Sequence, residues 1–117
     1  MQIKQRVVNH VLALRIDGRL EAATLHQLKA VLADDTQSTH FVFDMAHTSF
    51  IDSMGLSSLV SALKLARSRG GELILVNPSD EVRTILELTA MDKVFATASN
   101  VQSAMEMAGK HDDRTAP

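Results

Sequence analysis

The chain of 117 residues contains no cysteine, tryptophan or tyrosine. The lack of cysteine excludes disulfides and thiol chemistry, and it suits a reducing cytoplasm. Aromatic residues make up only 3% of the chain, too few for a platform on which single-stranded nucleic acid could stack. The net charge is −2 and no basic block is present, so we expect neither nucleic acid nor a membrane as a partner.

Long apolar stretches are also missing from the sequence. The N-terminal residues Met-Gln-Ile-Lys-Gln-Arg lack the apolar core of a secretion signal. No apolar run approaches the ~20 residues that cross a bilayer as a helix. The length fits one domain, and a hydrophobic content of 45% is ample for its core. We therefore expect a cytoplasmic, single-domain protein.

The apolar residues that are present alternate between the periods of strands and helices. They predict strands over residues 2–8, 11–17, 41–44, 73–76 and 94–96. The first two form a hairpin closed by Asn9-His10. The pattern predicts helices over residues 21–34, 53–69 and 100–108, and another that begins at Pro78 behind an Asn77 cap.

This order of elements predicts an α/β fold. We expect a single domain over residues 1–108, with a mixed, mostly parallel sheet of four to five strands, an N-terminal hairpin and about four α-helices. Residues 109–117 are polar and are expected to form a flexible C-terminal tail.

Function in such a sheet gathers at the carboxyl ends of the parallel strands. One of these ends leads into Ser53, at the start of a predicted helix, where unpaired N–H groups and the macrodipole favour an anion. The Ser53 hydroxyl is therefore either an ordinary helix cap or a site built to carry phosphate. Its neighbour Met54 either folds back onto the sheet or lies exposed on a docking surface.

Catalytic arrangements fit the sequence poorly. Ser53, Asp52 and His47 have the residue types of a hydrolytic triad, but they are too close in sequence to form its relay, and a Gly-x-Ser-x-Gly elbow is absent. The five histidines have neither i, i+4 pairing nor cysteine partners, so we expect no metal site. Asp44 lacks the acidic pair that a receiver domain requires. We expect a protein with no catalytic residues, no enzymatic activity and no cofactor.

Three segments carry a family resemblance. They are residues 18–24 (GRLEAAT), 44–56 (DMAHTSFIDSMGL) and 71–77 (GELILVN). Their order and spacing resemble the signature of STAS-domain anti-sigma-factor antagonists, also called anti-anti-sigma factors, over nearly the whole chain. In that family an apolar pair is followed by Asp-Ser/Thr-x-Gly-Leu, which corresponds here to residues 50–56.

The resemblance implies a phosphoprotein that switches partners in signal transduction and transcription regulation. In the family, the Ser or Thr after the Asp is phosphorylated by an anti-sigma factor that is itself a serine protein kinase of the histidine-kinase-like ATPase class. The acceptor here would be Ser53, and a PP2C-type phosphatase would reset it. The unphosphorylated form would bind the kinase and release its client. Nothing in the sequence demands more than a monomer, so we expect a monomer. The implied partner-binding residues are Glu21, Thr24, Asp52, Ser53, Met54, Gly55 and Leu56.

Three positions depart from the family pattern. Met54 stands where Ser or Thr is frequent, Ser57 where Gly is common, and Glu21 where Asp is usual. None of these departures removes the acceptor hydroxyl. A phosphoserine adds about −1.5 to −2 charges, and a penalty of ~3 kcal/mol would weaken docking roughly 100-fold without a change of fold.

Two other functions compete with this interpretation. In the first, the chain is a STAS subunit that docks an ATPase permanently in a transport or lipid-trafficking complex, with no phospho-switch and with Ser53 as a plain cap. In the second, the domain binds a small ligand, such as a nucleotide, at the strand ends.

Overall fold

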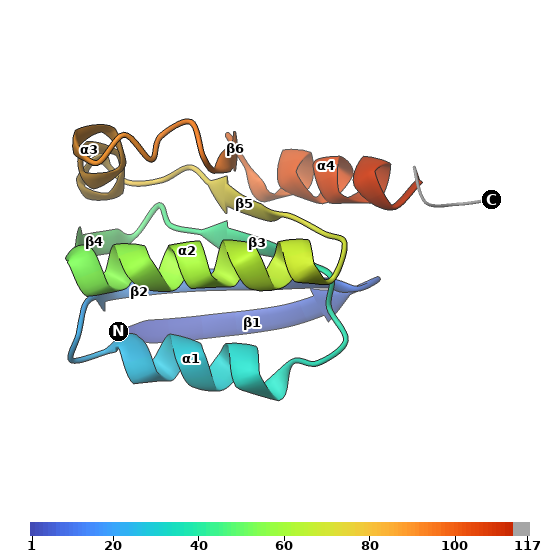
Figure 1. Ribbon diagram of the computed structural model, residues 1–117, viewed down its shortest axis with the longest axis horizontal. Coiled ribbons are helices and arrows are strands. Elements are labelled where there is room, and N and C mark those ends of the chain that lie inside the picture. Colours follow the sequence, from blue (N-terminus) through green and yellow to red (C-terminus); the bar gives the residue numbers. More distant parts are fainter. Residues whose placement is uncertain (114–117) are drawn as a thin grey trace.

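The computed structural model describes residues 1–113, with side chains as far as Gly109, and shows a mixed sheet with helices on both faces (Figure 1). The elements in chain order are β1 Gln2–Val8, β2 Val11–Leu20, α1 Leu25–Asp34, β3 His40–Asp44, β4 Thr48–Ile51, α2 Ser53–Ser68, β5 Leu73–Val76, α3 Asp80–Leu88, β6 Ala96–Ala98 and α4 Val101–Asp113. None of the described helices has the length and hydrophobicity that a bilayer crossing requires.

The sheet has the predicted mixed topology. Its strand order is β1-β2-β3-β5-β6, with β1 antiparallel to β2 and the following pairs parallel. The N-terminal hairpin turns at Asn9 and His10, whose φ angles of 48° and 66° suit a tight turn that follows the twist of the strands.

A sixth strand was not predicted. Strand β4 lies off the main strand order and pairs in parallel with the last residues of β2. Strand β2 was expected to stop at Asp17-Gly18, but it continues to Leu20 through an irregularity between Gly18 and Arg19. The described residues therefore form six strands, and the expected four to five is an undercount.

Two apolar cores hold the helices to the sheet. Helices α1 and α2 cover one face, where Phe41 and Phe43 of β3 are fully buried against side chains such as Leu59. Helix α4 covers the other face, where Val42 packs against alanines that let the helix lie close to the strands. The strand over residues 41–44 is thus covered on both faces, as its continuous apolar run predicts.

Helix α2 matches its predicted range to within one residue. The helix ends at Ser68 and is followed by Gly70, whose φ of 82° is a left-handed conformation, and the Gly71 N–H donates to the carbonyl of Ala66. This is the hydrogen bond of a glycine-terminated helix end. The predicted helix range 53–69 therefore stops where this glycine pair follows in the sequence.

Several other boundaries differ from the prediction. Helix α1 begins at Leu25 rather than at residue 21, because the preceding residues form a closed loop. Helix α3 is capped by the Ser79 hydroxyl, which accepts from the Val82 N–H, so the predicted Asn77 cap is wrong. Asn77 instead has a left-handed φ of 44° and turns the chain out of β5.

The C-terminal elements are also shifted. Strand β6 lies two residues after its predicted position. Helix α4 continues to Asp113, past the expected domain end at residue 108. The rest of the predicted tail, residues 114–117, lies outside the described residues.

Candidate functional site

The ends of β2 and β4 lie side by side and position the predicted site. Arg19 pairs with Phe50 and Leu20 with Ile51 in the parallel register. The loop that follows β2 and the start of α2, which follows β4, therefore emerge at the same edge of the sheet. This pairing brings together two of the segments that carry the family resemblance.

Asp52 links these two segments. Its Oδ1 accepts a hydrogen bond from the Gly55 N–H at 2.8 Å, and its Oδ2 accepts one from the Ala22 N–H at 3.2 Å. The hydrogen bond from Gly55 is the main reason why the pKa of Asp52 is lowered from its ordinary value of 3.8. Asp52 is thus the N-cap of α2, and the interpretation of Ser53 as a plain helix cap is wrong.

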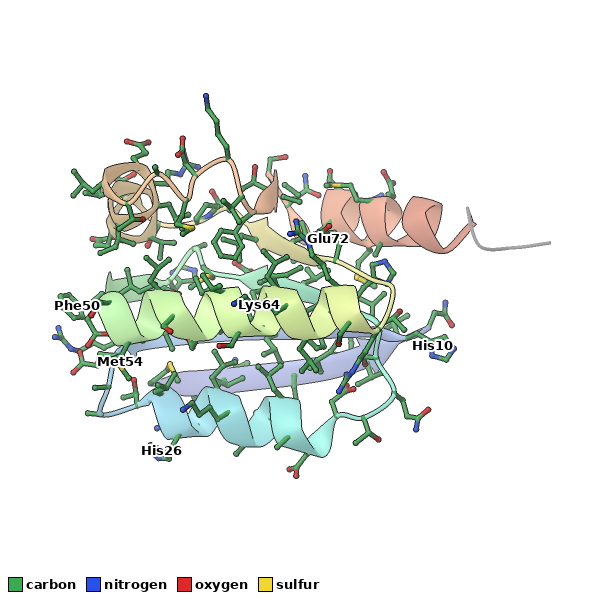
Figure 2. The ribbon with its side chains drawn as sticks, viewed as in Figure 1. His10, His26, Phe50, Met54, Lys64 and Glu72 are labelled. Atoms are coloured by element: carbon green, nitrogen blue, oxygen red, sulfur yellow. The ribbon has the colours of Figure 1, made fainter. Side chains whose placement is uncertain are left out.

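Ser53 is the first residue of α2 and is exposed. Within the described part of the chain, no hydrogen bond engages its hydroxyl. The side chain of Met54 is also exposed, at 48% of its surface, so it does not fold back onto the sheet. Met54 and Phe50 lie at the same end of the molecule in Figure 2. The Ser53 hydroxyl, which makes no hydrogen bond among the described residues, therefore lies near exposed apolar side chains at the positive end of α2.

The loop after β2 adds charge to this surface. Thr24 orders the loop, since its hydroxyl donates to the Arg19 carbonyl at 2.6 Å and accepts from the Glu21 N–H at 3.1 Å. The Glu21 carboxylate pairs with the Arg19 side chain at 2.6 Å. The Arg19 guanidinium lies 4.2 Å from the centre of the Phe50 ring, within cation–π range.

We call the exposed and half-exposed side chains gathered here the Ser53 surface; they are Arg19, Glu21, Phe50, Ser53 and Met54. Arg19 and Phe50 are absent from the residues predicted to bind a partner. They belong to the motif segments, but the parallel register that stacks one on the other cannot be read from the sequence. Their exposure is likewise a property of the tertiary structure.

Gly55 and Leu56 lie beneath the Ser53 surface. Both are buried, and a Cβ at position 55 would overlap the carbonyl oxygen of Leu20. Glycine there lets α2 approach the end of β2, and Leu56 anchors the helix in the core. The structure therefore gives these two predicted partner-binding residues a positioning role.

The other candidates from the sequence form no joint site. Asp44 Oδ1 accepts from the Ala46 N–H at 3.1 Å in a tight turn. Among the described residues, no hydrogen bond joins Ser53, Asp52 and His47 as a relay would require. The described residues contain no cluster of three or more histidine, aspartate or glutamate side chains that could hold a metal ion.

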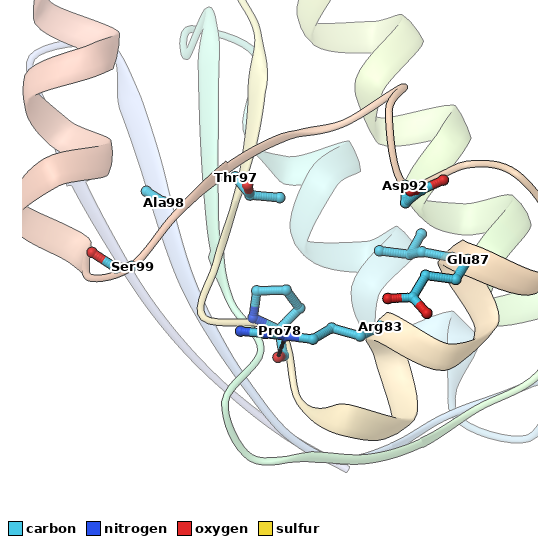
Figure 3. Close-up of a pocket in the computed structure, with 8 residues that line it drawn as sticks. Pro78, Arg83, Glu87, Asp92, Thr97, Ala98 and Ser99 are labelled. Carbon is cyan, nitrogen blue, oxygen red and sulfur yellow. Dashed lines mark hydrogen bonds between the residues drawn. The ribbon is translucent and has the colours of Figure 1, made fainter.

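A separate cleft of about 370 Å³ lies at the carboxyl ends of β5 and β6, against α3 (Figure 3). Arg83 projects beside Pro78 in this view, and its Nε donates to the Pro78 carbonyl at 2.9 Å. The carboxylates of Glu87 and Asp92 also line the cleft. One cation against two anions is a poor charge balance for a nucleotide phosphate.

The sequence of this chain can now be compared with those of known proteins. Residues 2–104 match the STAS domain family. The chain belongs to the STAS domain family. The anti-sigma-B factor antagonist of Listeria monocytogenes is 29% identical to this STAS domain over 107 residues, which is 90% of this chain and 92% of that protein.

Solved structures agree with this STAS fold. A candidate anti-sigma factor antagonist from Thermotoga maritima has a TM-score of 0.83 and 26% identity, covering 91% of this chain and 93% of that one. Unphosphorylated SpoIIAA has a TM-score of 0.78 at 20% identity (92% and 97% covered), and phosphorylated Bacillus SpoIIAA has 0.72 at 19% (91% and 98%). The two SpoIIAA likenesses bear on the fold alone.

Proposed function

We propose that this STAS domain is an anti-sigma factor antagonist that acts in a partner switch. The unphosphorylated form binds an anti-sigma factor that is a serine protein kinase of the histidine-kinase-like ATPase class, and this binding releases the kinase's client. Phosphorylation of Ser53 blocks the binding. The Listeria relative, which is named an anti-sigma-B factor antagonist, supports the functional class.

The observation that carries the proposal is that Asp52, and not Ser53, caps helix α2. Because Asp52 caps the helix, the Ser53 hydroxyl makes no structural hydrogen bond within the described residues. A phosphate on Ser53 would therefore break no contact that holds the fold. Its exposure leaves the hydroxyl within reach of both a kinase and a PP2C-type phosphatase.

Electrostatics favour a switch of binding rather than of fold. In the free protein, a phosphate at the start of α2 would face water and the positive end of the helix dipole. In a complex, it would replace a small hydroxyl beside Met54 and Phe50 and would lose its hydration against the partner. The Asp52 carboxylate beside Ser53 already carries a negative charge, whereas that of Glu21 is paired with Arg19. A phosphate on Ser53 would therefore add to the negative charge of Asp52 and increase repulsion from any acidic group of the partner.

A kinase assay tests the proposal. The histidine-kinase-like serine kinases of the source genome are purified, incubated with ATP and this chain, and phosphate is mapped by mass spectrometry. We expect phosphate on Ser53, retained binding but no phosphorylation for Ser53→Ala, and roughly 100-fold weaker binding for Ser53→Asp. Ser57, exposed one turn along the same helix, is the matched control, and Ser57→Asp should leave phosphorylation of Ser53 intact.

Two results would contradict the proposal. Phosphate found on Ser49 or Ser57, with Ser53 unmodified, would show that Ser53 is not the phosphorylation site. An ATPase that copurifies at fixed stoichiometry and binds Ser53→Asp as tightly as the unmodified chain would favour a permanent subunit of a transport or lipid-trafficking complex.

A further inference from the structure

A groove of about 380 Å³ lies between β4 and α3 and shares Phe50 with the Ser53 surface. Ile85 and Leu88 of α3 line its other side. Leu88 is 80% exposed, the highest fraction among the large apolar side chains of the described residues. Apolar surface therefore continues from Phe50 to α3, and the exposed Met54 lies at the same end of the molecule as Phe50 (Figure 2), a distribution typical of an interaction site.

The groove also has an acidic rim. Asp80 and Glu81, in the first turn of α3, are exposed and line it. No ion pair within the described residues neutralises either carboxylate. Two negative charges beside an apolar floor favour a ligand with apolar side chains and flanking cations.

We propose that this groove binds an apolar segment, flanked by lysine or arginine, of the same kinase that docks on the Ser53 surface. The inference rests on the proposed function and extends its interface from Ser53 to α3. Continuity through Phe50 lets one partner cover both regions. Apolar side chains of the segment would pack on Phe50, Ile85 and Leu88, while its cations would face Asp80 and Glu81.

Charge disfavours a second copy of this chain as the occupant. A two-fold contact at the groove would bring the two acidic rims together, and like charges at an interface oppose association. The cleft lined by Arg83, Glu87 and Asp92 differs from this groove in charge and in position. It has a cation beside its carboxylates, and it shares no lining residue with the Ser53 surface.

Binding of groove variants to the kinase that binds the unmodified chain tests the inference. We expect Leu88→Asp to bind at least about 10-fold more weakly. Glu81→Lys should bind several-fold more weakly and with a smaller dependence on salt. Met107→Asp and Glu106→Lys on α4 are the matched controls at exposed positions and should stay within about twofold of the unmodified chain. Thermal unfolding of each free variant verifies the fold.

The outcomes separate this inference from the proposed function. If Ser53→Asp weakens binding but Leu88→Asp and Glu81→Lys bind like the unmodified chain, the groove inference is overturned and the switch stands. If no kinase binds the unmodified chain, both are overturned. If sedimentation shows that the free chain is a dimer and Leu88→Asp a monomer, the occupant is a second copy and the inference is wrong.

Discussion

Each end of helix α2 lies beside an aspartate and a serine, Asp52 and Ser53 at its start and Asp35 and Ser38 of the loop between α1 and β3 near its end, and the two pairs are used differently. At its start, Asp52 accepts backbone N–H groups only, and the Ser53 hydroxyl is left exposed. Beyond its end, Asp35 accepts from both the N–H and the hydroxyl of Ser38, at 2.8 and 2.6 Å, and Ser38 is fully buried. The same residue types therefore leave an exposed hydroxyl at one end and form a closed structural network at the other.

The network at the far end also anchors the helix. Arg69, the C-cap, donates to the carbonyl oxygens of Ser38 and Asp35 at 2.8 and 3.0 Å, and its guanidinium lies 3.6 Å from the Asp35 carboxylate. The Asp35 carboxylate, the Ser38 hydroxyl and the Arg69 guanidinium therefore all have hydrogen-bond partners within the domain. The difference shows that a serine at a helix start is left without a structural hydrogen bond when a neighbouring side chain caps the helix.

The largest effect on the free energy of unfolding is expected from replacing the glycines at the two ends of α2, because both ends pack closely against backbone. A Cβ at Gly55 would overlap the Leu20 carbonyl, and one at Gly71 would overlap the Thr39 carbonyl. We expect Gly55→Ala and Gly71→Ala each to lower the free energy of unfolding by about 3 kcal/mol, because backbone must move. Denaturant unfolding measures this loss.

Gly109 is the control for these two variants. It lies in α4 and an added Cβ there would meet nothing within 4 Å. Gly109→Ala should therefore stabilise the protein by about 0.5–1 kcal/mol through helix propensity. A loss below about 1 kcal/mol in Gly55→Ala would show that this end of the helix shifts easily, and it would contradict the close docking of both ends.

Replacing the two aspartates should give the next largest effects. Asp35→Ala leaves the Ser38 N–H and hydroxyl without their acceptor and should cost about 2–3 kcal/mol. Asp52→Ala removes a helix cap and should cost about 1 kcal/mol. Both losses are measured as free energies of unfolding. The opposite ranking would mean that the start of α2, not its end, is the more structural site.

The two serine variants should also differ in stability, though by less than the two aspartate variants do. Ser38→Ala removes a buried hydroxyl and its hydrogen bond, with an expected loss of about 1 kcal/mol. Ser53→Ala should change stability by less than about 0.5 kcal/mol, because its side chain is exposed. Thermal and denaturant unfolding of the two variants test the comparison. A comparable loss in both would indicate a structural hydrogen bond at Ser53.

The pH dependence of stability should show the smallest effect. At Asp35, burial raises the pKa, but hydrogen bonds from Ser38 and Gln37 and the charge of Arg69 outweigh it, so the net shift is downward. The pKa of Asp52 is lowered as well. Since both folded-state values lie below the ordinary 3.8, both groups stabilise the fold above about pH 4, and this contribution is lost as pH falls through the folded-state pKa values.

The free energy of unfolding, measured from pH 7 to about pH 2.5, tests whether stability falls with pH as expected. Asp35→Asn and Asp52→Asn should each flatten the acid limb of the stability curve. We expect the smaller change for Asp52→Asn, because solvent screens the more exposed carboxylate. An unchanged acid limb in both variants would contradict the lowered pKa values.

Much of the fold followed from the sequence, because it depends on local patterns. The apolar period and the glycines predicted α2 closely, and the continuous apolar run predicted β5. The positions of Ser53 and Asp52 at a helix start were also correct. The assignment of Ser53 as a phosphorylation site stays a prediction.

Strand β4 could not be predicted in the same way. It has four residues, and what makes it a strand is pairing with the end of β2, about thirty positions away in the sequence. That pairing also decides which residue caps α2. Asp and Ser are both good caps, and the register of β4 turns the chain so that the Asp52 carboxylate meets both Gly55 and Ala22.

The sequence by itself determined five of the six strands and the four helices, in their order, and a serine at the start of α2, since each depends on neighbouring residues. Only the tertiary structure decided that Asp52 caps the helix, that Ser53 and Met54 are exposed and that the apolar surface continues to Leu88. These properties depend on which distant strands pair and which helix packs beside them, and no local pattern contains that information.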